Sequence, residues 1–307
     1  MTITETVSLA QQEQHRQTLV DRLRFMLPRI VLAPSFAITL IFVYGFILWT
    51  VYLSFTRSRI LPVYEIVGFD AYIRLWSQPN WYMAIKNLAI FGVLYIGFCL
   101  AIGLFIAILL DQRIRAEGLL RPIFLYPMAL SFVVTGTAWK WFLNPGLGLE
   151  RTMHNLGWES FKFDWLVNTD MAIYTIVIAG VWQASGFVMA MFLAGLRGID
   201  GEIIKAAQID GATTFAIYRR IIIPLLRPVF LSAIIVLAHM AIKSYDLVIA
   251  LTGGGPGNAT ELPSTFMYSY TFTRSQMAVG SASAVMMLMG ITAIIVPYLY
   301  SELREKR

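Results

Sequence analysis

Charged residues and cysteine are both scarce in this chain. Asp, Glu, Lys and Arg make up 14% of its 307 residues, whereas hydrophobic residues make up 58%. A soluble domain usually carries about 25% charged residues, so the deficit excludes an ordinary water-facing surface and predicts an integral membrane protein. The single cysteine, Cys99, lies inside an apolar run. This excludes a disulfide within the chain and a metal site built from cysteines.

The motifs of common membrane hydrolases and nucleotide-binding proteins are also missing. The sequence has three histidines (His15, His154 and His239) and contains neither His-Glu-x-x-His nor Gly-x-Ser-x-Gly. The Walker pattern Gly-x-x-x-x-Gly-Lys-Ser/Thr is absent as well, so the chain is not predicted to hydrolyse ATP itself. These absences disfavour a membrane enzyme. We predict a non-catalytic chain that holds no metal and no cofactor of its own.

Long apolar runs are abundant instead. A helix needs about 20 apolar residues to cross a hydrocarbon core roughly 30 Å thick. Six stretches meet this criterion, at residues 30–53, 84–110, 122–143, 172–196, 228–250 and 277–301. Because unpaired backbone groups are costly in lipid, each stretch is predicted to be helical. The predicted fold is therefore an all-α membrane protein with a transmembrane domain over residues 30–301.

Lys and Arg fall unevenly on the two sides of these spans. They are concentrated in the leader 1–29, in the loop after the second span, in the loop 197–227 and in the tail 302–307. Excess basic residues favour the cytoplasmic side, so both termini are predicted to be cytoplasmic. The formal net charge of +6 is explained by this orientation rather than by nucleic-acid binding.

The predicted cytoplasmic loop 197–227 is polar and basic. Residues 203–209 are predicted to form a short helix, and Gly211 a turn, since glycine accepts backbone angles that other residues resist. A second helix is predicted over 214–223, capped by Asp210 and stopped by Pro224. A helix pair at the membrane face suits insertion into a partner, although spacing alone favours a simple connection between two spans.

The same loop resembles the cytoplasmic EAA loop of ATP-binding-cassette (ABC) importer permeases. In that family Glu-Ala-Ala is followed by three residues and a Gly, and then by nine further residues and Ile-x-Leu-Pro. The matching positions here are Ala206, Ala207, Gly211, Ile221 and Pro224. Lys205 replaces the usual Glu, and Ile223 replaces the usual Leu. Glu202, one turn earlier, is a candidate to supply the missing carboxylate.

The resemblance extends over about residues 68–300. The stretches that carry it are GFDAYIRLW at 68–76, WKWFLNP at 139–145, DGA at 210–212, RPVF at 227–230 and SYDLVIALTGGGPGNAT at 244–260. The last of these is typical of the carbohydrate branch. The chain therefore resembles the larger permease subunit of the maltose/glycerol-phosphate-type subfamily.

The resemblance implies a type I importer permease with six transmembrane helices and a cytoplasmic coupling helix. It places this helix in a cleft of a separate ATPase, with coupling residues Glu202, Lys205, Ala206, Ala207, Asp210 and Gly211. It further implies a second permease subunit of different sequence, two ATPase subunits that bind ATP and Mg, and an extracytoplasmic solute-binding protein. The expected location is the bacterial inner (cytoplasmic) membrane, and the expected cargo is a carbohydrate or a derivative of one.

Polar and aromatic residues within the spans are candidates for the solute path, because ionisable groups there are costly. The candidates are Lys243, Ser244, Tyr245 and Asp246 in the fifth span, Trp182 and Gln183 in the fourth, and Trp139 and Asn144 near the outer end of the third. Lys243 and Asp246 are three residues apart, so one helical face would present both. The pair would equally serve to fix helix packing. Gly180, Gly186 and Gly195 are predicted to permit close helix contacts.

An ion-coupled secondary transporter is the alternative function. Such a carrier is expected to bear buried carboxylates along its helices, and Asp246 is almost alone among the predicted spans. The sequence does not identify the sugar.

Overall fold

The computed structural model describes residues 26–29, 31–112 and 117–305. Within these residues the chain is helical and forms no strand, apart from one isolated bridge between Thr56 and Ile66. Most of the predicted leader and the last two residues of the predicted tail lie outside the described residues. The chain divides into two units, residues 1–52 and 53–307, and the second contains every candidate site residue.

The helices follow one another with short connections. They are α2 (Gly45–Ser54), α3 (Asp70–Trp76), α4 (Pro79–Asp111), α5 (Glu117–Ala129), α6 (Phe132–Phe142), α7 (Leu149–Asn155), α8 (Ala172–Arg197), α9 (Gly201–Ile209), α10 (Thr214–Ile217), α11 (Ile223–Leu225), α12 (Arg227–Ile242), α13 (Asp246–Leu251), α14 (Pro263–Tyr268) and α15 (Met277–Glu305). π-Helical turns at Leu40–Tyr44, Tyr218–Ile222 and Ser269–Thr273 precede α2, join α10 to α11 and follow α14, respectively.

Among the described residues, four helical segments are long and apolar enough to cross a membrane: Met26–Ser54, Pro79–Asp111, Ala172–Arg197 and Met277–Pro297. Two further pairs of helices qualify only when each pair is taken as one bent span. The helices Glu117–Ala129 and Phe132–Phe142 meet at 98°, and Thr214–Leu225 meets Arg227–Ile242 at 62°. The predicted third span, 122–143, is thus broken in the structure, and the predicted fifth helix ends at Ile242 rather than at 250.

Helix α8 forms the centre of the 53–307 unit. In its most apolar window 67% of the residues are buried, against 28% for α4 and α15. A helix that is apolar on all sides is expected to be covered on all sides, and α8 packs against α4 and α5. As predicted, glycines permit close contacts of α8 with α4 and with α12. A Cβ at Gly180 would lie 3.3 Å from the Tyr95 ring, and one at Gly195 would lie 2.8 Å from side-chain atoms of Leu226 and Val229.

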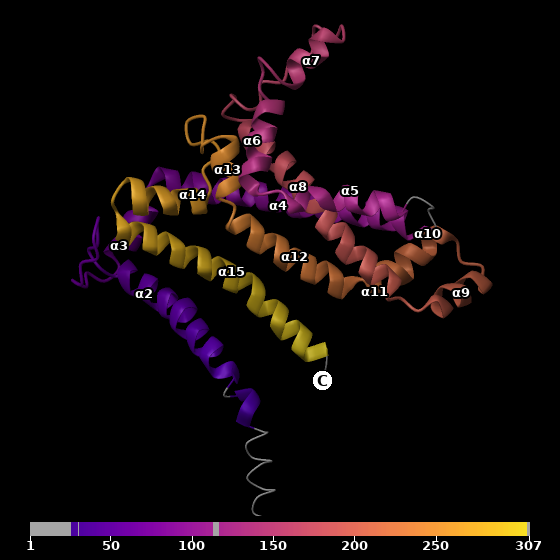
Figure 1. The fold of residues 1–307 in the computed structure, drawn as a ribbon, viewed down its shortest axis with the longest axis horizontal. Coiled ribbons are helices and arrows are strands. Elements are labelled where there is room, and N and C mark those ends of the chain that lie inside the picture. The colour runs from indigo at the N-terminus through magenta and orange to yellow at the C-terminus, as the bar shows by residue number, and fades with distance from the viewer. Residues whose placement is uncertain (1–25, 30, 113–116, 306–307) are drawn as a thin grey trace, which may run out of the picture. The chain divides into compact units, whose positions relative to one another are not determined.

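The unit has two distinct ends (Figure 1). Helices α9 and α10 lie at one end, and α3, α14 and the start of α15 lie at the other. A second apolar cluster joins these last three helices to the start of α4, around Leu75, Trp81, Phe266 and Tyr270. Exposed side chains such as Val93 and Phe105 on α4 present an apolar surface suited to lipid.

Candidate coupling segment and solute path

Helix α9 begins the loop that the sequence predicts to couple to a partner. Asp200 is its N-cap, and the Asp200 carboxylate accepts a hydrogen bond of 2.9 Å from the backbone amide of Glu202. The predicted first helix is confirmed, and it starts two residues earlier than expected. Gly211 has a φ of +78°, a conformation that glycine adopts without steric cost. The predicted turn at Gly211 is therefore confirmed too.

The second helix begins differently from the prediction. Its N-cap is Thr213, whose hydroxyl accepts a hydrogen bond of 3.3 Å from the amide of Ala216. The prediction that Asp210 caps this helix is wrong, because Asp210 lies too early in the chain and ends α9 instead. Pro224 does not end the second helix either. It stands in the first turn of α11, where its missing amide donor is tolerated, and the helix runs on to Leu225.

The surface of α9 is almost entirely uncovered in the 53–307 unit. Ala207 is its buried residue and joins the main apolar core, whereas Ala206 on the neighbouring position is exposed. Ile209 is 86% exposed, and Ile203 is exposed as well. Lys205 Nζ lies 2.9 Å from Glu202 Oε1, with both side chains mostly in solvent, where an ion pair contributes little stability. The helix thus presents an apolar and charged face with nothing packed on it.

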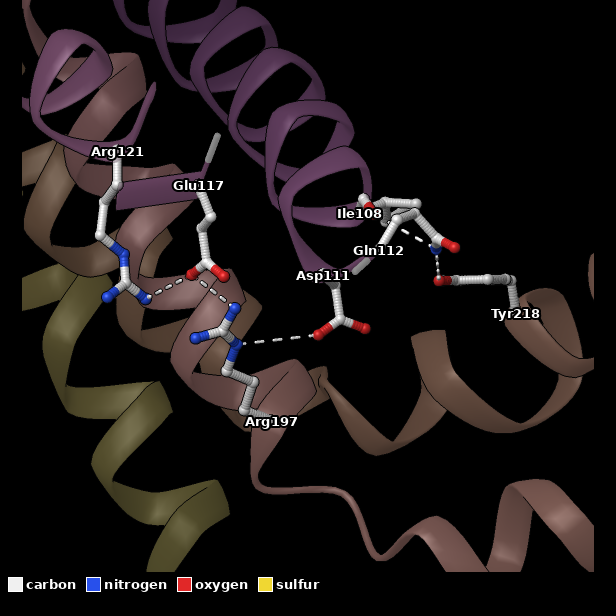
Figure 2. Close-up of polar contacts among 7 residues, drawn as sticks. All are labelled: Ile108, Asp111, Gln112, Glu117, Arg121, Arg197 and Tyr218. Carbon is white, nitrogen blue, oxygen red and sulfur yellow. Dashed lines mark hydrogen bonds and ion pairs between the residues drawn. The ribbon is translucent and has the colours of Figure 1, made fainter. Parts of the chain in front are cut away.

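A polar cluster fixes the end of α8 just before α9 begins (Figure 2). Arg197 Nη2 lies 2.6 Å from Glu117 Oε1, and Arg197 Nε lies 3.9 Å from Asp111 Oδ1. Arg121 approaches the same Glu117 oxygen at 3.7 Å. The cluster therefore ties the end of α4 and the start of α5 to the end of α8. The sequence analysis counted Arg197 only among the basic residues of the loop 197–227. A single sequence gives no sign that this residue pairs with acids about 80 residues earlier in the chain.

The second helix of the loop is tied to α4 as well. Gln112 directly follows α4, and its amide nitrogen donates a hydrogen bond of 3.4 Å to the Tyr218 hydroxyl. The same nitrogen lies 3.5 Å from the Ile108 carbonyl oxygen (Figure 2). The loop is thereby anchored to the membrane domain at its start, by Arg197, and in its second helix, by Tyr218. Helix α9, between these two points, remains uncovered.

The break between α5 and α6 explains the position of Gln183. Its side-chain amide donates a hydrogen bond of 2.8 Å to the carbonyl of Leu130, a residue within the break. Gln183 is 3% exposed, so this contact satisfies a backbone group that would otherwise be unpaired inside the protein. Ser131 caps the start of α6 by accepting a bond from Val134. Gln183 therefore supports the broken span from within α8.

The break between α12 and α13 separates two candidates that the sequence places together. Lys243 is the C-cap of α12, and Asp246 is the first residue of α13. The prediction that one helical face presents both is wrong, because the helix is interrupted between them. No ion pair joins them within the part of the chain that the structure describes, and both are exposed. The carbonyl of Ser244, inside the break, accepts a bond of 2.8 Å from the Ser264 hydroxyl.

The aromatic candidates lie in two places. The Trp139 and Trp182 ring centroids are 5.8 Å apart, and with Ala138 and Phe142 they line an open apolar depression of about 240 Å³. Tyr245, in the second helix break, packs on Tyr268 with centroids 4.7 Å apart, and Tyr268 continues to Phe272 at 5.0 Å.

The remaining candidate, Asn144, directly follows Leu143, the C-cap of α6. Its side-chain oxygen accepts a hydrogen bond of 2.9 Å from the amide of Gly146. The structure therefore gives Asn144 a local role in shaping the turn after α6.

The sequence analysis missed two residues at the glycine-rich loop 252–262, namely Glu261 within the loop and Asn87 on α4, which holds it. Asn87 on α4 donates hydrogen bonds to the carbonyls of Ala259 at 2.9 Å and Glu261 at 3.0 Å. Glu261 is 6% exposed, and one of its carboxylate oxygens has no partner among the described atoms. Burial raises the pKa of the Glu261 carboxyl to about 7, against a smaller lowering by Arg274. A buried acid in a loop leaves no periodic signal in a sequence.

Several membrane-length apolar helices, two sharply broken helix pairs and an uncovered helix at one end together define the architecture of a membrane transport permease. Comparison with known families identifies it further. The family described as "Binding-protein-dependent transport system inner membrane component" matches residues 99–307. This chain belongs to that family, whose members are the non-catalytic membrane components of ABC importers. Membership favours this function over an ion-coupled carrier.

Similar proteins cover nearly the whole chain. A probable ABC transporter permease of Pyrococcus horikoshii is 39% identical over 89% of this chain and 95% of its own length. The xylose/arabinose import permease XacH of Haloferax volcanii is 35% identical over 88% of this chain and 86% of its own length. A solved bacterial ABC transporter involved in alginate import has the same fold, with a TM-score of 0.81 at 19% identity, over 94% of this chain and 100% of the solved chain.

Proposed function

We propose that this chain translocates a carbohydrate, or a derivative of one, through the inner (cytoplasmic) membrane, and that α9 is the helix through which a separate ATPase drives it. The names of its relatives support the cargo class. XacH is named for xylose and arabinose import, and a 29% identical permease of Thermococcus litoralis is named for trehalose and maltose transport.

The uncovered α9 is the observation that carries the proposed coupling. Ile203 and Ile209 expose apolar side chains at the end of the molecule opposite α3 and α14. Asp200 caps the start of α9, Ala207 is its one buried side chain, and Gly211 turns the chain after it. Such a projecting helix with a bare apolar face suits insertion into a cleft of a soluble subunit. We assign Glu202, Lys205, Ala206, Asp210 and Gly211 to this contact or its geometry, and Ala207 to the attachment of α9.

The assembly that this function requires contains further chains. We infer six spans in this chain, each bent pair counting as one, with both termini in the cytoplasm. A second permease of different sequence completes the path, two ATPase subunits bind ATP and Mg, and an extracytoplasmic binding protein delivers the solute. The solved alginate transporter, crystallised with an alginate-loaded periplasmic protein, shares this chain's fold and is compatible with such an arrangement.

We place the solute path at the two helix breaks. Irregular backbone at membrane depth is tolerated where it lines a cavity or is covered by protein. Tyr245 offers an aromatic face at the second break, beside Ser244 and the exposed charges of Lys243 and Asp246. Trp139 and Trp182 offer aromatic faces near the first break, with Asn144 beyond α6. Gln183 is a positioning residue for that break.

The turn at Gly211 provides the test of coupling. Proline requires a φ near −65° and has no amide donor, whereas Gly211 has a φ of +78° and donates a bond to the Gln208 carbonyl. Gly211→Pro should abolish both uptake and solute-stimulated ATP hydrolysis in the reconstituted transporter. The matched control is Gly201→Ala, since Gly201 opens the same helix with free space around it and without a positive φ. Normal uptake by Gly211→Pro would refute the proposed coupling.

Site-directed labelling tests the contact directly. Cys99 is the sole cysteine and is buried, so an introduced thiol is labelled against a low background. We expect Ile209→Cys to react with a maleimide in the isolated chain and to be protected in the complex with the ATPase. Phe215→Cys, exposed on the second helix, reports how far the contact extends. Equal labelling of Ile209→Cys with and without the ATPase would remove α9 from the interface.

A further inference from the structure

A cavity of about 390 Å³ lies at the end of the 53–307 unit opposite α9. Its walls are residues 56–60, one face of α3 and the beginning of α15. These segments are joined by backbone hydrogen bonds. The carbonyl of Ser58 accepts a bond of 3.0 Å from the amide of Ala278, and the carbonyl of Arg59 accepts one of 3.2 Å from the amide of Met277. The hairpin that contains the isolated Thr56–Ile66 bridge is thereby fixed onto α15.

Four arginines line this cavity together with a single carboxylate, Asp70. Arg74 Nη2 lies 2.7 Å from Asp70 Oδ2, so these two charges compensate each other. Arg57 has a looser partner, with Nη1 at 3.7 Å from Glu65 Oε1. Two of the four arginines, Arg74 and Arg57, are therefore each paired with a carboxylate.

Neither of the other two arginines has a carboxylate within ion-pair distance among the described residues, although the charge of Arg274 reaches the buried Glu261 and lowers the pKa of that carboxyl. Arg274 donates a hydrogen bond of 3.0 Å to the neutral Tyr270 hydroxyl and lies 4.6 Å from the centre of that ring. For Arg59, no acidic side chain lies within ion-pair distance among the described residues. The first amides of α15 are already occupied by the hairpin carbonyls. An anion in the cavity would thus be held by guanidinium groups rather than by the helix end.

The surroundings of the cavity indicate what kind of anion it takes. Ile60 and Leu61 on the hairpin are 71% and 72% exposed, and Ile73 on α3 is also exposed. Trp76 ends α3, and its ring centroid lies 5.8 Å from that of Tyr82. Aromatic residues of this kind are enriched at membrane–water interfaces. Arginine matches the oxygens of a phosphate with its planar fork. A phosphate attached to acyl chains would satisfy both the charges and the apolar rim.

We propose that this arginine cavity binds the phosphodiester of an anionic phospholipid, with Arg59 and Arg274 as its principal contacts. Guanidinium groups bind phosphate oxygens through charged and often bidentate hydrogen bonds, whichever leaflet supplies the lipid. The bound lipid would bridge the hairpin to α3 and α15 and stabilise this end of the permease.

Native mass spectrometry of the purified full chain tests the proposal. The delipidated protein in neutral detergent is titrated with phosphatidylglycerol, with phosphatidylcholine and with free glycerol 3-phosphate. We expect the chain to retain phosphatidylglycerol preferentially, and Arg59→Gln to weaken that retention about tenfold, as loss of one charged hydrogen bond implies. Arg151→Gln is the matched control, because Arg151 is an exposed arginine on α7, outside the cavity.

Each outcome decides the proposal. The Arg59 side chain forms no ion pair with the described residues, so Arg59→Gln should fold even if Arg274→Gln, which also loses the Tyr270 bond, does not. Equal retention of phosphatidylglycerol by Arg59→Gln and Arg151→Gln would overturn the site. Binding of glycerol 3-phosphate as tight as that of the lipid would overturn the lipid as its occupant. Unchanged lipid retention with a lost affinity for the solute-binding protein would reassign the cavity to protein docking.

Discussion

The contact between α6 and α13 gives the most quantitative prediction. Both helices follow a break, and Gly136 is the point where they touch. A Cβ at Gly136 would lie 2.6 Å from the Ala250 Cβ and 3.1 Å from the Leu247 carbonyl oxygen. Carbon atoms pack best at about 3.5–4.0 Å, so Gly136→Ala forces the helices apart by roughly 1 Å. Overpacking of this kind costs about 1–3 kcal/mol.

We therefore expect Gly136→Ala to lower the melting temperature of the purified protein by roughly 3 °C, the shift that about 2 kcal/mol produces when unfolding entropy scales with chain length. Thermal scanning fluorimetry in detergent measures it. Ala250→Gly removes the closest of these atoms and should restore part of the loss in the double variant. Gly97→Ala is the control, because nothing lies within 4 Å of a Cβ at Gly97. Strictly additive losses for Gly136→Ala and Ala250→Gly would refute the packing argument.

Three further predictions follow from the same structure. Gly186→Ala should destabilise more than Gly136→Ala, because its Cβ would collide with the backbone carbonyl of Phe124, which cannot rotate away; a smaller loss in the same melting assay would contradict this. Glu261 has a folded pKa of about 7 against an ordinary 4.5, so the folded state holds its proton more tightly than the unfolded state does. The stability that the protonated Glu261 contributes is therefore present below about pH 4.5 and is lost as the pH rises through about 7. The free energy of unfolding falls by roughly 3 kcal/mol over this range. Glu261→Gln should flatten that part of the curve of melting temperature against pH, and an unchanged slope would refute the assignment. Tyr245→Ala should impair uptake by the reconstituted transporter while Tyr245→Phe, which keeps the ring on Tyr268, retains most of it; equal uptake by the two variants would remove the ring from the solute path.

Much of the fold could be predicted from the sequence, because lipid imposes a strong compositional rule. The apolar runs at 84–110, 172–196 and 277–301 each correspond to one long helix. The turn at Gly211 could be predicted as well, since a glycine between two helical patterns has a direct conformational meaning. These features depend on residues close together in the chain.

The helix breaks could not be predicted in the same way. Apolar composition continues across Leu130 and Ser131, so a hydropathy pattern sees one span where the structure has two helices at 98°. The break is stabilised from a distance, by the Gln183 bond to Leu130. Lys243 and Asp246 failed as a pair for the same reason, because their spacing has meaning only in an unbroken helix. Contacts between distant parts of the chain, such as the hydrogen bonds from Asn87 to the carbonyls of Ala259 and Glu261, cannot be predicted from local sequence patterns either.

Helix α8 connects the two parts of the proposed mechanism. At one end Arg197 is held by Glu117 and Asp111, and α9 starts four residues further along the chain. Fourteen residues earlier, about 21 Å along the helix axis, Gln183 holds the break between α5 and α6. A movement imposed on α9 therefore acts on a helix that is buried along most of its length and cannot bend freely. We expect it to shift as a rigid rod, and to carry the irregular backbone at Leu130 with it through the Gln183 bond. The solute path would then change where the backbone is already irregular, without the rupture of any continuous helix.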